Sequence, residues 1–262
     1  MDLKPIKDET RLQMLGHDMG SIFGGMGYAY SRPFHWEGKQ WGQAGLVMGT
    51  TGVAYLIDDP VSDEMRAIRD DVPKWIRDYG WNIGSPENNF MLTGGVYLTG
   101  LISKNEKLRR TGVLLVSSAA SAGLLQTVLK SVVGRARPLS GHTKDTFKPF
   151  SKGEALFESF PSGHAILAFT NAYAVGKQFE NKWVKAGIYT VGLVPGISRI
   201  WEGKHWLSDV VFSWAISIFT VEAIDRYLDR RYSEKYNDTA QKNVRWDLTF
   251  GPGTLGLVLH LE

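Results

Sequence analysis

Six long runs without a charged residue fill much of this chain, and they constrain its fold more than any other feature. Each run contains 12 to 19 residues. The runs cover residues 40–57, 88–103, 111–129, 159–176, 186–198 and 210–221. We interpret them, with their flanking segments, as helices joined mostly by short loops. The predicted fold class is therefore all-α, in the form of a helical bundle.

Residues 61–79 carry an amphipathic helical pattern. Apolar side chains recur there at helical spacing along one stripe, whereas the opposite face mixes acidic and basic side chains. A face with so many acids does not favour anionic lipid, so we expect the apolar stripe to contact the bundle core. The sequence predicts one helix over this range, bent at Pro73.

The end of the chain has a different periodicity. Trp246, Leu248 and Phe250 alternate with polar residues, a Gly-Pro-Gly turn follows at 251–253, and leucines recur at every second position over 255–259. Alternation of this kind is typical of strands. We therefore predict a short β-like C-terminal tail, either a hairpin or an extended arm packed on the bundle.

Two cations, Lys130 and Arg137, stand seven residues apart before Pro138. If this stretch is helical, both side chains lie on one face about two turns apart, where they can converge on one anion. Arg135 then points elsewhere. Pro138 is expected to end the helix just after the second cation.

Two further stretches complete a candidate anion site. In Pro-Ser-Gly-His at 161–164, Ser162 has the character of an N-cap, and the free amides after it can face an anion. In the second stretch Arg199 adds a cation, and His205 and Asp209 are four residues apart. On one helix face that spacing lets a carboxylate hold one imidazole nitrogen and leave the other free.

Together these motifs resemble the type 2 phosphatidic acid phosphatase family, which shares its fold with bacterial class A acid phosphatases and vanadium haloperoxidases. KSVVGRARP at 130–138, PSGH at 161–164 and SRIWEGKHWLSD at 198–209 occur in the family's order. The resemblance covers roughly residues 85–225, and we predict one helical phosphatase domain over residues 1–232. Its motif-bearing core covers about 85–225, and residues 233–262 form the tail.

The resemblance also implies roles for the phosphate-binding residues. Lys130, Arg137 and Arg199 would hold the phosphate oxygens, with help from Ser162 and the Gly163 amide. Positioning and charge neutralisation by such groups are most of what phosphoryl transfer requires from a protein.

Three further roles are carried over from the family. His205 would be the nucleophile and form a phosphohistidine, and Asp209 would fix its tautomer. His164 would be the general acid that protonates the leaving oxygen.

The expected activity is hydrolysis of phosphomonoesters or pyrophosphates, without a metal or other cofactor and with vanadate as an inhibitor. No His, Cys and carboxylate cluster has metal-ligand spacing, and Asp58-Asp59-Pro60 is interpreted as a helix stop and turn. Two alternatives stay open. One is a vanadium-dependent haloperoxidase with His205 as the axial ligand, and the other is a non-catalytic phosphate- or lipid-binding protein.

A lipid phosphate is the expected substrate, because Trp201, Trp206 and Phe160 border the motifs and can form an apolar approach. They can equally be core aromatics. The net charge of +3 and the lack of like-charge blocks give no indication of a nucleic-acid partner.

Location is the least determined property. The last two uncharged runs, with 13 and 12 residues, fall well short of the roughly 17 to 25 residues of a membrane span, and the mean hydropathy is −0.18. We therefore expect a soluble or peripheral protein, with an integral inner-membrane protein as the alternative. The family acts outside the inner membrane, so we expect a periplasmic or cell-envelope location and a native signal peptide that has been removed. The sequence gives no indication of oligomeric state.

Overall fold

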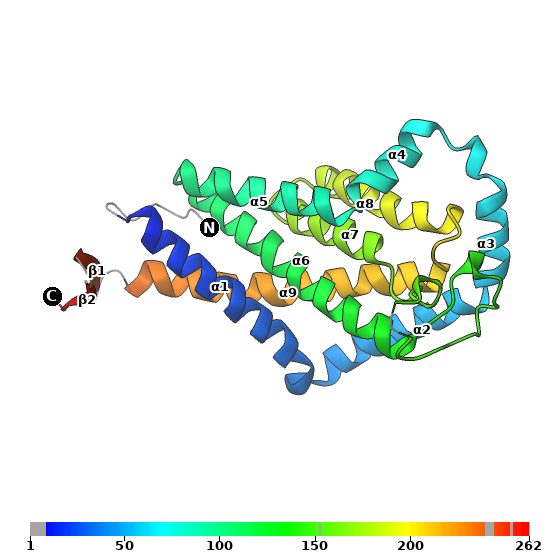
Figure 1. Ribbon diagram of the computed structural model, residues 1–262, viewed down its shortest axis with the longest axis horizontal. Coiled ribbons are helices and arrows are strands. Elements are labelled where there is room, and N and C mark those ends of the chain that lie inside the picture. Colours follow the sequence, from blue (N-terminus) through cyan, green and yellow to red (C-terminus); the bar gives the residue numbers. More distant parts are fainter. Residues whose placement is uncertain (1–8, 152, 239–243, 252–253, 262) are drawn as a thin grey trace.

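The computed structural model describes residues 9–151, 153–238, 244–251 and 254–261, and these are almost entirely helical (Figure 1). The five helices that carry or flank the motifs run roughly along the long axis. They are α5 (Pro86–Ile102), α6 (Glu106–Val133), α7 (Gly163–Gly176), α8 (Lys182–Trp201) and α9 (Leu207–Asp238). The remaining helices are α1 (Arg11–Ser31), α2 (Gly38–Leu56), α3 (Asp58–Ala67) and α4 (Lys74–Ile83). The predicted all-α bundle is confirmed.

The core lies where α6, α7 and α9 meet, with α1 packed across α6 and α9 (Figure 1). Leu114 on α6, Ala174 on α7 and Ile224 on α9 are completely buried in one cluster. Small side chains further along α6, including Ser118 and Ala122, are also buried, so neighbouring helices can approach its backbone closely. This packing fixes the relative positions of the helix ends that carry the motifs.

Helix α6 ends at Val133, before the second predicted cation. Gly134 follows in the left-handed conformation with φ of 59°, and a side chain there would meet the Lys148 carbonyl. Glycine at this position is a common helix terminator. The prediction that one helix carries both Lys130 and Arg137 is therefore wrong, because Arg137 lies in the loop that follows.

The predicted single helix over 61–79 is also wrong. The segment divides into α3, a short 3₁₀ turn at Arg69–Asp71, and α4. Pro73 stands at the N-cap of α4 with ψ of 136°, an extended conformation that starts a helix instead of continuing one. As a result α4 forms a separate unit that packs on α8.

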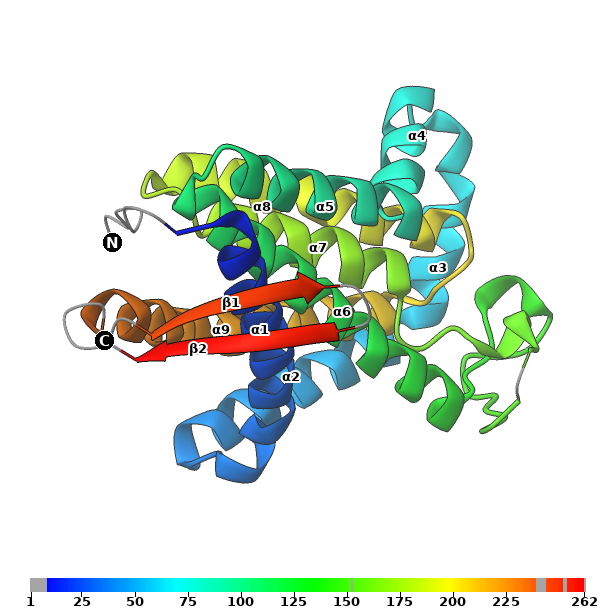
Figure 2. The same cartoon turned by 60° about the vertical axis from the view of Figure 1, so that its left-hand side comes forward.

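The C-terminal segment forms the predicted hairpin (Figure 2). Strand β1 (Val244–Gly251) pairs antiparallel with β2 (Thr254–Leu261). The register joins Val244 to Leu261 and Gly251 to Thr254.

Two helices in the described part of the chain are long and apolar enough to cross a membrane, Glu106–Val133 and Leu207–Lys235. Large apolar side chains are also exposed on other helices. Phe23 on α1 is 65% exposed, Leu46 on α2 71% and Met91 on α5 75%. An exposed apolar surface this extensive is rare on soluble monomers. The expectation of a soluble or peripheral protein is not confirmed, and these features fit the integral alternative.

Candidate active site

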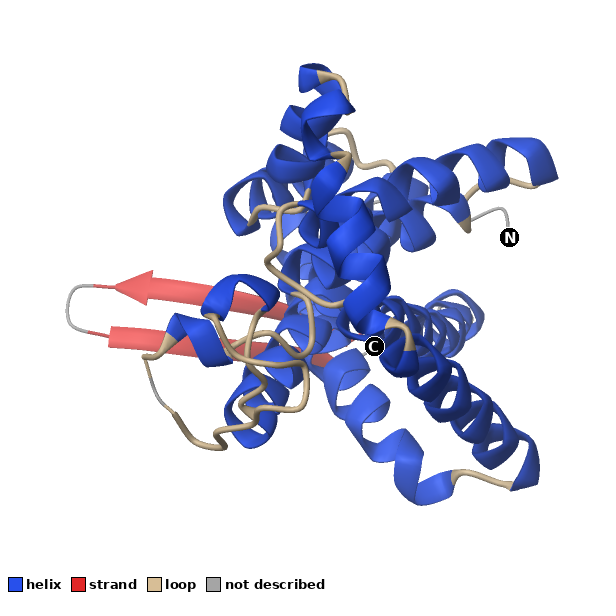
Figure 3. Cartoon of the chain, turned by 90° about the vertical axis from the view of Figure 1, so that its right-hand side faces the viewer, coloured by secondary structure: helices blue, strands red, loops and turns tan. Residues whose placement is uncertain are grey.

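The motif residues come together at one end of the bundle. The C-terminal ends of α6 and α8 and the N-terminal ends of α7 and α9 lie there, joined by loops that cross this end (Figures 1 and 3). Three stretches that are separate in the sequence therefore form one site.

Lys130 and Arg137 converge although they do not share a helix. The Lys130 ammonium donates to the Glu158 carbonyl at 2.9 Å, and the Arg137 guanidinium approaches the same oxygen at 3.4 Å. The Arg137 Nε is buried and has no hydrogen-bond partner in the part of the chain that the structure describes. Two cations on one neutral carbonyl leave most of their charge uncompensated, as a phosphate site requires.

The N-terminus of α7 adds amide donors. Ser162 is the N-cap residue, as predicted, but its hydroxyl makes no capping bond. The backbone N–H of Ser162 donates to the Ser213 hydroxyl at 2.8 Å, and the Ser162 Oγ is buried without a partner. Gly163 and His164 follow at the first two helical positions, where backbone N–H groups have no partner within the helix.

Trp81 on α4 holds two of the predicted site residues, and the sequence analysis did not identify it. The His164 ring lies 5.5 Å from the Trp81 ring, and the Arg199 guanidinium lies over the same ring at 4.9 Å. Gly80 and Gly84 flank this tryptophan, and a side chain on either would clash with Ser198 or with His164. The two glycines thus let α4 approach the site closely.

His205 is oriented through its Nδ1. That nitrogen lies 2.5 Å from the Ser159 carbonyl oxygen and 3.8 Å from an Asp209 carboxylate oxygen. A carbonyl can only accept, so Nδ1 carries the proton and donates it, and Nε2 keeps a free lone pair. Burial, together with the nearby Lys130 and Arg137 charges, lowers the pKa of His205 to about 4, although Asp209 opposes the shift. The ring is therefore neutral near pH 7.

Asp209 is fully buried and has several donors. Its carboxylate accepts from Arg135 at 2.6 Å, from the Ser159 hydroxyl at 2.5 Å and from the Trp206 backbone N–H at 2.9 Å. The last bond caps the N-terminus of α9. His205 precedes that helix, so it does not share a helix face with Asp209 as the spacing predicted.

Arg135 is a central structural residue at the end of the bundle that carries the motifs, and the sequence analysis missed this role. Its guanidinium is buried, donates to Ser208 and Asp209, and pairs with Asp58 at 2.7 Å. Asp58 also accepts from the backbone N–H and hydroxyl of Ser208. A helix does stop here, since α2 ends at Leu56, but Asp58 itself begins α3 and is completely buried, so its interpretation as a turn residue was wrong. A buried carboxylate needs such a partner.

The aromatic residues beside the motifs belong to the core. Trp201 and Trp206 are only 6% and 5% exposed, and the Trp206 indole N–H donates to the Ala136 carbonyl. Phe160 lies against Phe212 with 4.8 Å between ring centroids. Of the two interpretations that the sequence left open, core packing applies to both tryptophans.

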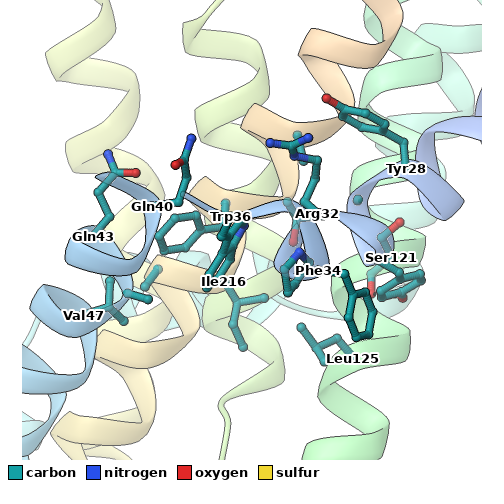
Figure 4. Close-up of a pocket in the computed structure, with 18 of the residues that line it drawn as sticks. Tyr28, Arg32, Phe34, Trp36, Gln40, Gln43, Val47, Ser121, Leu125 and Ile216 are labelled. Atoms are coloured by element: carbon teal, nitrogen blue, oxygen red, sulfur yellow. Dashed lines mark hydrogen bonds between the residues drawn. The ribbon is translucent and has the colours of Figure 1, made fainter. Parts of the chain in front are cut away.

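Phe212 is also one of the residues that line an apolar cavity of about 560 Å³. Figure 4 shows this cavity. Residues of α1, α2, α6 and α9 line it, and Arg32 and Tyr28 lie together at one end. None of the predicted phosphate-binding or catalytic residues lines this cavity.

Comparison with known proteins assigns a family to part of the chain. Residues 111–232 match the sequence model of the PAP2 superfamily. These residues are a PAP2 domain. The domain contains all three motifs, so the resemblance is confirmed.

Relatives and a solved structure agree with this assignment. The chain is 37% identical over 105 residues to the lipid A 1-phosphatase of Rhizobium etli, across 38% of this chain and 43% of that protein. It is 32% identical over 121 residues to the undecaprenyl-diphosphatase BcrC of Bacillus subtilis, across 46% and 60%. The chain thus spans less than two thirds of the length of these relatives.

The fold is shared with a transmembrane PAP2-type phosphatidylglycerolphosphate phosphatase from Bacillus subtilis. That structure superposes with a TM-score of 0.50 at 18% identity, covering 82% of this chain and 96% of the other. At this identity the likeness extends to the fold alone.

Proposed function

We propose that this protein is a metal-independent phosphatase of lipid phosphates that acts through a phosphohistidine on His205. One observation carries the proposal. His205 donates a hydrogen bond from its Nδ1 to a main-chain carbonyl, so the lone pair of the neutral ring lies on Nε2. Burial, together with the charges of Lys130 and Arg137 that would hold the phosphate, lowers the pKa of the same ring to about 4.

In the first step Nε2 of His205 forms a bond to phosphorus while the bond from phosphorus to the leaving oxygen breaks. Lys130, Arg137 and Arg199, with the first amides of α7, neutralise the three non-bridging oxygens. The leaving oxygen takes its proton from His164, whose Nε2 is buried and has no hydrogen-bond partner among the described residues. Burial, with the nearby Arg199 charge, lowers the pKa of His164 to about 3 in the free protein, so the negative charge of the bound phosphate must raise this pKa for the ring to act as the acid.

In the second step water attacks phosphorus and gives a proton back to His164, and the phosphorus–nitrogen bond breaks to release phosphate. Ser159 and Asp209 keep His205 in one orientation through both steps. Arg135 donates to Asp209, and Asp58 in turn pairs with Arg135. Neither Arg135 nor Asp58 contacts the reacting atoms.

Lipids are the proposed substrates, and two observations support them. The relatives named above are phosphatases of lipid A and of undecaprenyl diphosphate. The exposed apolar surface and the two helices long enough to span a bilayer suit an integral membrane protein of the cell envelope. Such a protein meets its substrate within the membrane.

Phosphate release from lipid phosphates by the purified protein tests the proposal. We expect release to continue in excess chelator, to be inhibited by vanadate, which mimics five-coordinate phosphorus, and to be lost in His205→Ala. Loss of activity on chelation, with recovery on adding a divalent metal, would contradict the mechanism. Extraction from membranes by detergent but not by alkaline carbonate is expected for an integral protein.

A further inference from the structure

A second, polar cavity adjoins the candidate active site on the side of α4. It has a volume of about 340 Å³ and shares Arg199 and Trp81 with the site. Its lining residues come from the 3₁₀ turn, α4 and α8, and they are Arg69, Lys74, Arg77, Asp78, Trp81, Arg199 and Glu202.

Cations exceed acids in this lining by four to two. Arg69 is paired with Glu202 at 3.1 Å and Lys74 with Asp78 at 2.5 Å, so both of the lining acids are already in use. Among the described residues, Arg77 pairs only with Asp70, at 3.4 Å, and its buried Nε has no hydrogen-bond partner. Together with Arg199, Arg77 therefore leaves positive charge in the cavity for an external anion.

The cavity lies on the side where the leaving group departs. An in-line displacement places the nucleophile and the leaving oxygen on opposite sides of phosphorus. His164, the proposed proton donor to the leaving oxygen, contacts Trp81 on α4, and Trp81 lines the cavity. The group attached to the leaving oxygen is thus directed towards Arg77 and Lys74.

We propose that this cavity binds a phosphate carried by the leaving group, so that lipid diphosphates are preferred over lipid monophosphates. The inference rests on the proposed phosphatase function. His205 attacks the terminal phosphorus, the bond from that phosphorus to the bridging oxygen breaks, and the proton of His164 passes to that oxygen. The leaving group is then a lipid monophosphate, whose phosphate lies beside Arg77 and Lys74. Arg77 and Lys74 determine specificity and do not touch the phosphorus that reacts.

The test compares farnesyl diphosphate with farnesyl monophosphate, two lipids that differ by one phosphate. For Arg77→Gln we expect the ratio of kcat/KM values, diphosphate over monophosphate, to fall about tenfold, since a charge-assisted contact is lost. Lys74→Gln should lower the ratio less, because Asp78 shares its charge. Lys39→Gln, an exposed cation at the start of α2, is the matched control and should leave the ratio unchanged.

The outcomes separate the two proposals. Hydrolysis of both lipids by Arg77→Gln at an unchanged ratio would overturn the diphosphate inference and leave the phosphatase function standing. Hydrolysis of neither lipid by the unsubstituted protein would overturn both. If Arg77→Gln does not fold, inhibition of the unsubstituted protein tests the diphosphate inference instead. Methylenediphosphonate should inhibit it at least tenfold more strongly than methylphosphonate, and equal inhibition would contradict the inference.

Discussion

Ser159 contacts His205 and Asp209 through different groups. Its carbonyl accepts the Nδ1 proton of His205 at 2.5 Å, and its hydroxyl donates to Asp209 at 2.5 Å. Asp209 itself lies 3.8 Å from the imidazole. A main-chain carbonyl therefore fixes the tautomer of the proposed nucleophile, and the carboxylate adds charge and holds Ser159 in place.

Asp209→Asn should reduce activity only in part. In a serine protease triad the same change costs about 10⁴-fold, because the imidazole takes the wrong tautomer. Here the Ser159 carbonyl keeps the proton on Nδ1, so we expect a loss of roughly 10- to 100-fold in kcat. Steady-state kinetics on a lipid phosphate measure this loss in kcat. A loss as large as that of His205→Ala would show that Asp209 alone sets the tautomer.

Arg135→Met should destabilise the protein strongly and independently of catalysis. The substitution leaves the Asp58 and Asp209 carboxylates buried without their shared cation, which costs about 3–5 kcal/mol in unfolding free energy. The double variant Arg135→Met/Asp58→Asn should recover part of that loss. Thermal unfolding in detergent compares both variants with Arg231→Met, a substitution of an exposed arginine on α9. An Arg135→Met protein as stable as this control would contradict the structural role of Arg135.

The acid limb of the pH–rate profile should lie near pH 4. Nucleophilic attack requires neutral His205, and its lowered pKa of about 4 keeps the ring unprotonated at higher pH. As the pH falls through that value the ring gains a proton and kcat/KM should decline. The dependence of kcat/KM on pH reports ionisations of the free enzyme. A decline already centred near the ordinary histidine value of about 6.5 would contradict this environment.

His164→Ala should be impaired according to the leaving group. With an alkyl phosphate the variant must expel an unprotonated alkoxide, so turnover should fall by roughly 10²- to 10⁴-fold. With nitrophenyl phosphate the leaving oxygen needs no proton, and the first step should be nearly unchanged. Burst kinetics on the two substrates make the comparison. Equal impairment on both would exclude His164 as the acid.

The sequence predicted the composition of this site better than its geometry. Lys130, Arg137, His164, Arg199 and His205 gather at one end of the bundle, because each motif stands next to a helix terminus. The sequence analysis placed the end of α6 too late, just after Arg137, although Gly134 is a recognisable helix terminator.

Contacts between residues that are far apart in the chain could not be predicted from the sequence. Arg135 and Asp58 are 77 positions apart, and no local pattern links them. The position of Trp81 could not be predicted either, because the packing of α4 on α8 brings it to the site. The uncharged runs also underestimated helix length. The run 210–221 has 12 residues but lies within α9, which has 32, because the helix continues past Glu222 through a stretch rich in charged residues.

Trapping the covalent intermediate tests the central claim most directly. Rapid acid-free quenching of the protein with a ³²P-labelled lipid phosphate, followed by digestion and mass spectrometry, locates the label. We expect it on the His205 imidazole, stable to base and labile to acid, and absent in His205→Ala. Label on any other residue, or single-turnover hydrolysis without label on the protein, would contradict the proposed mechanism.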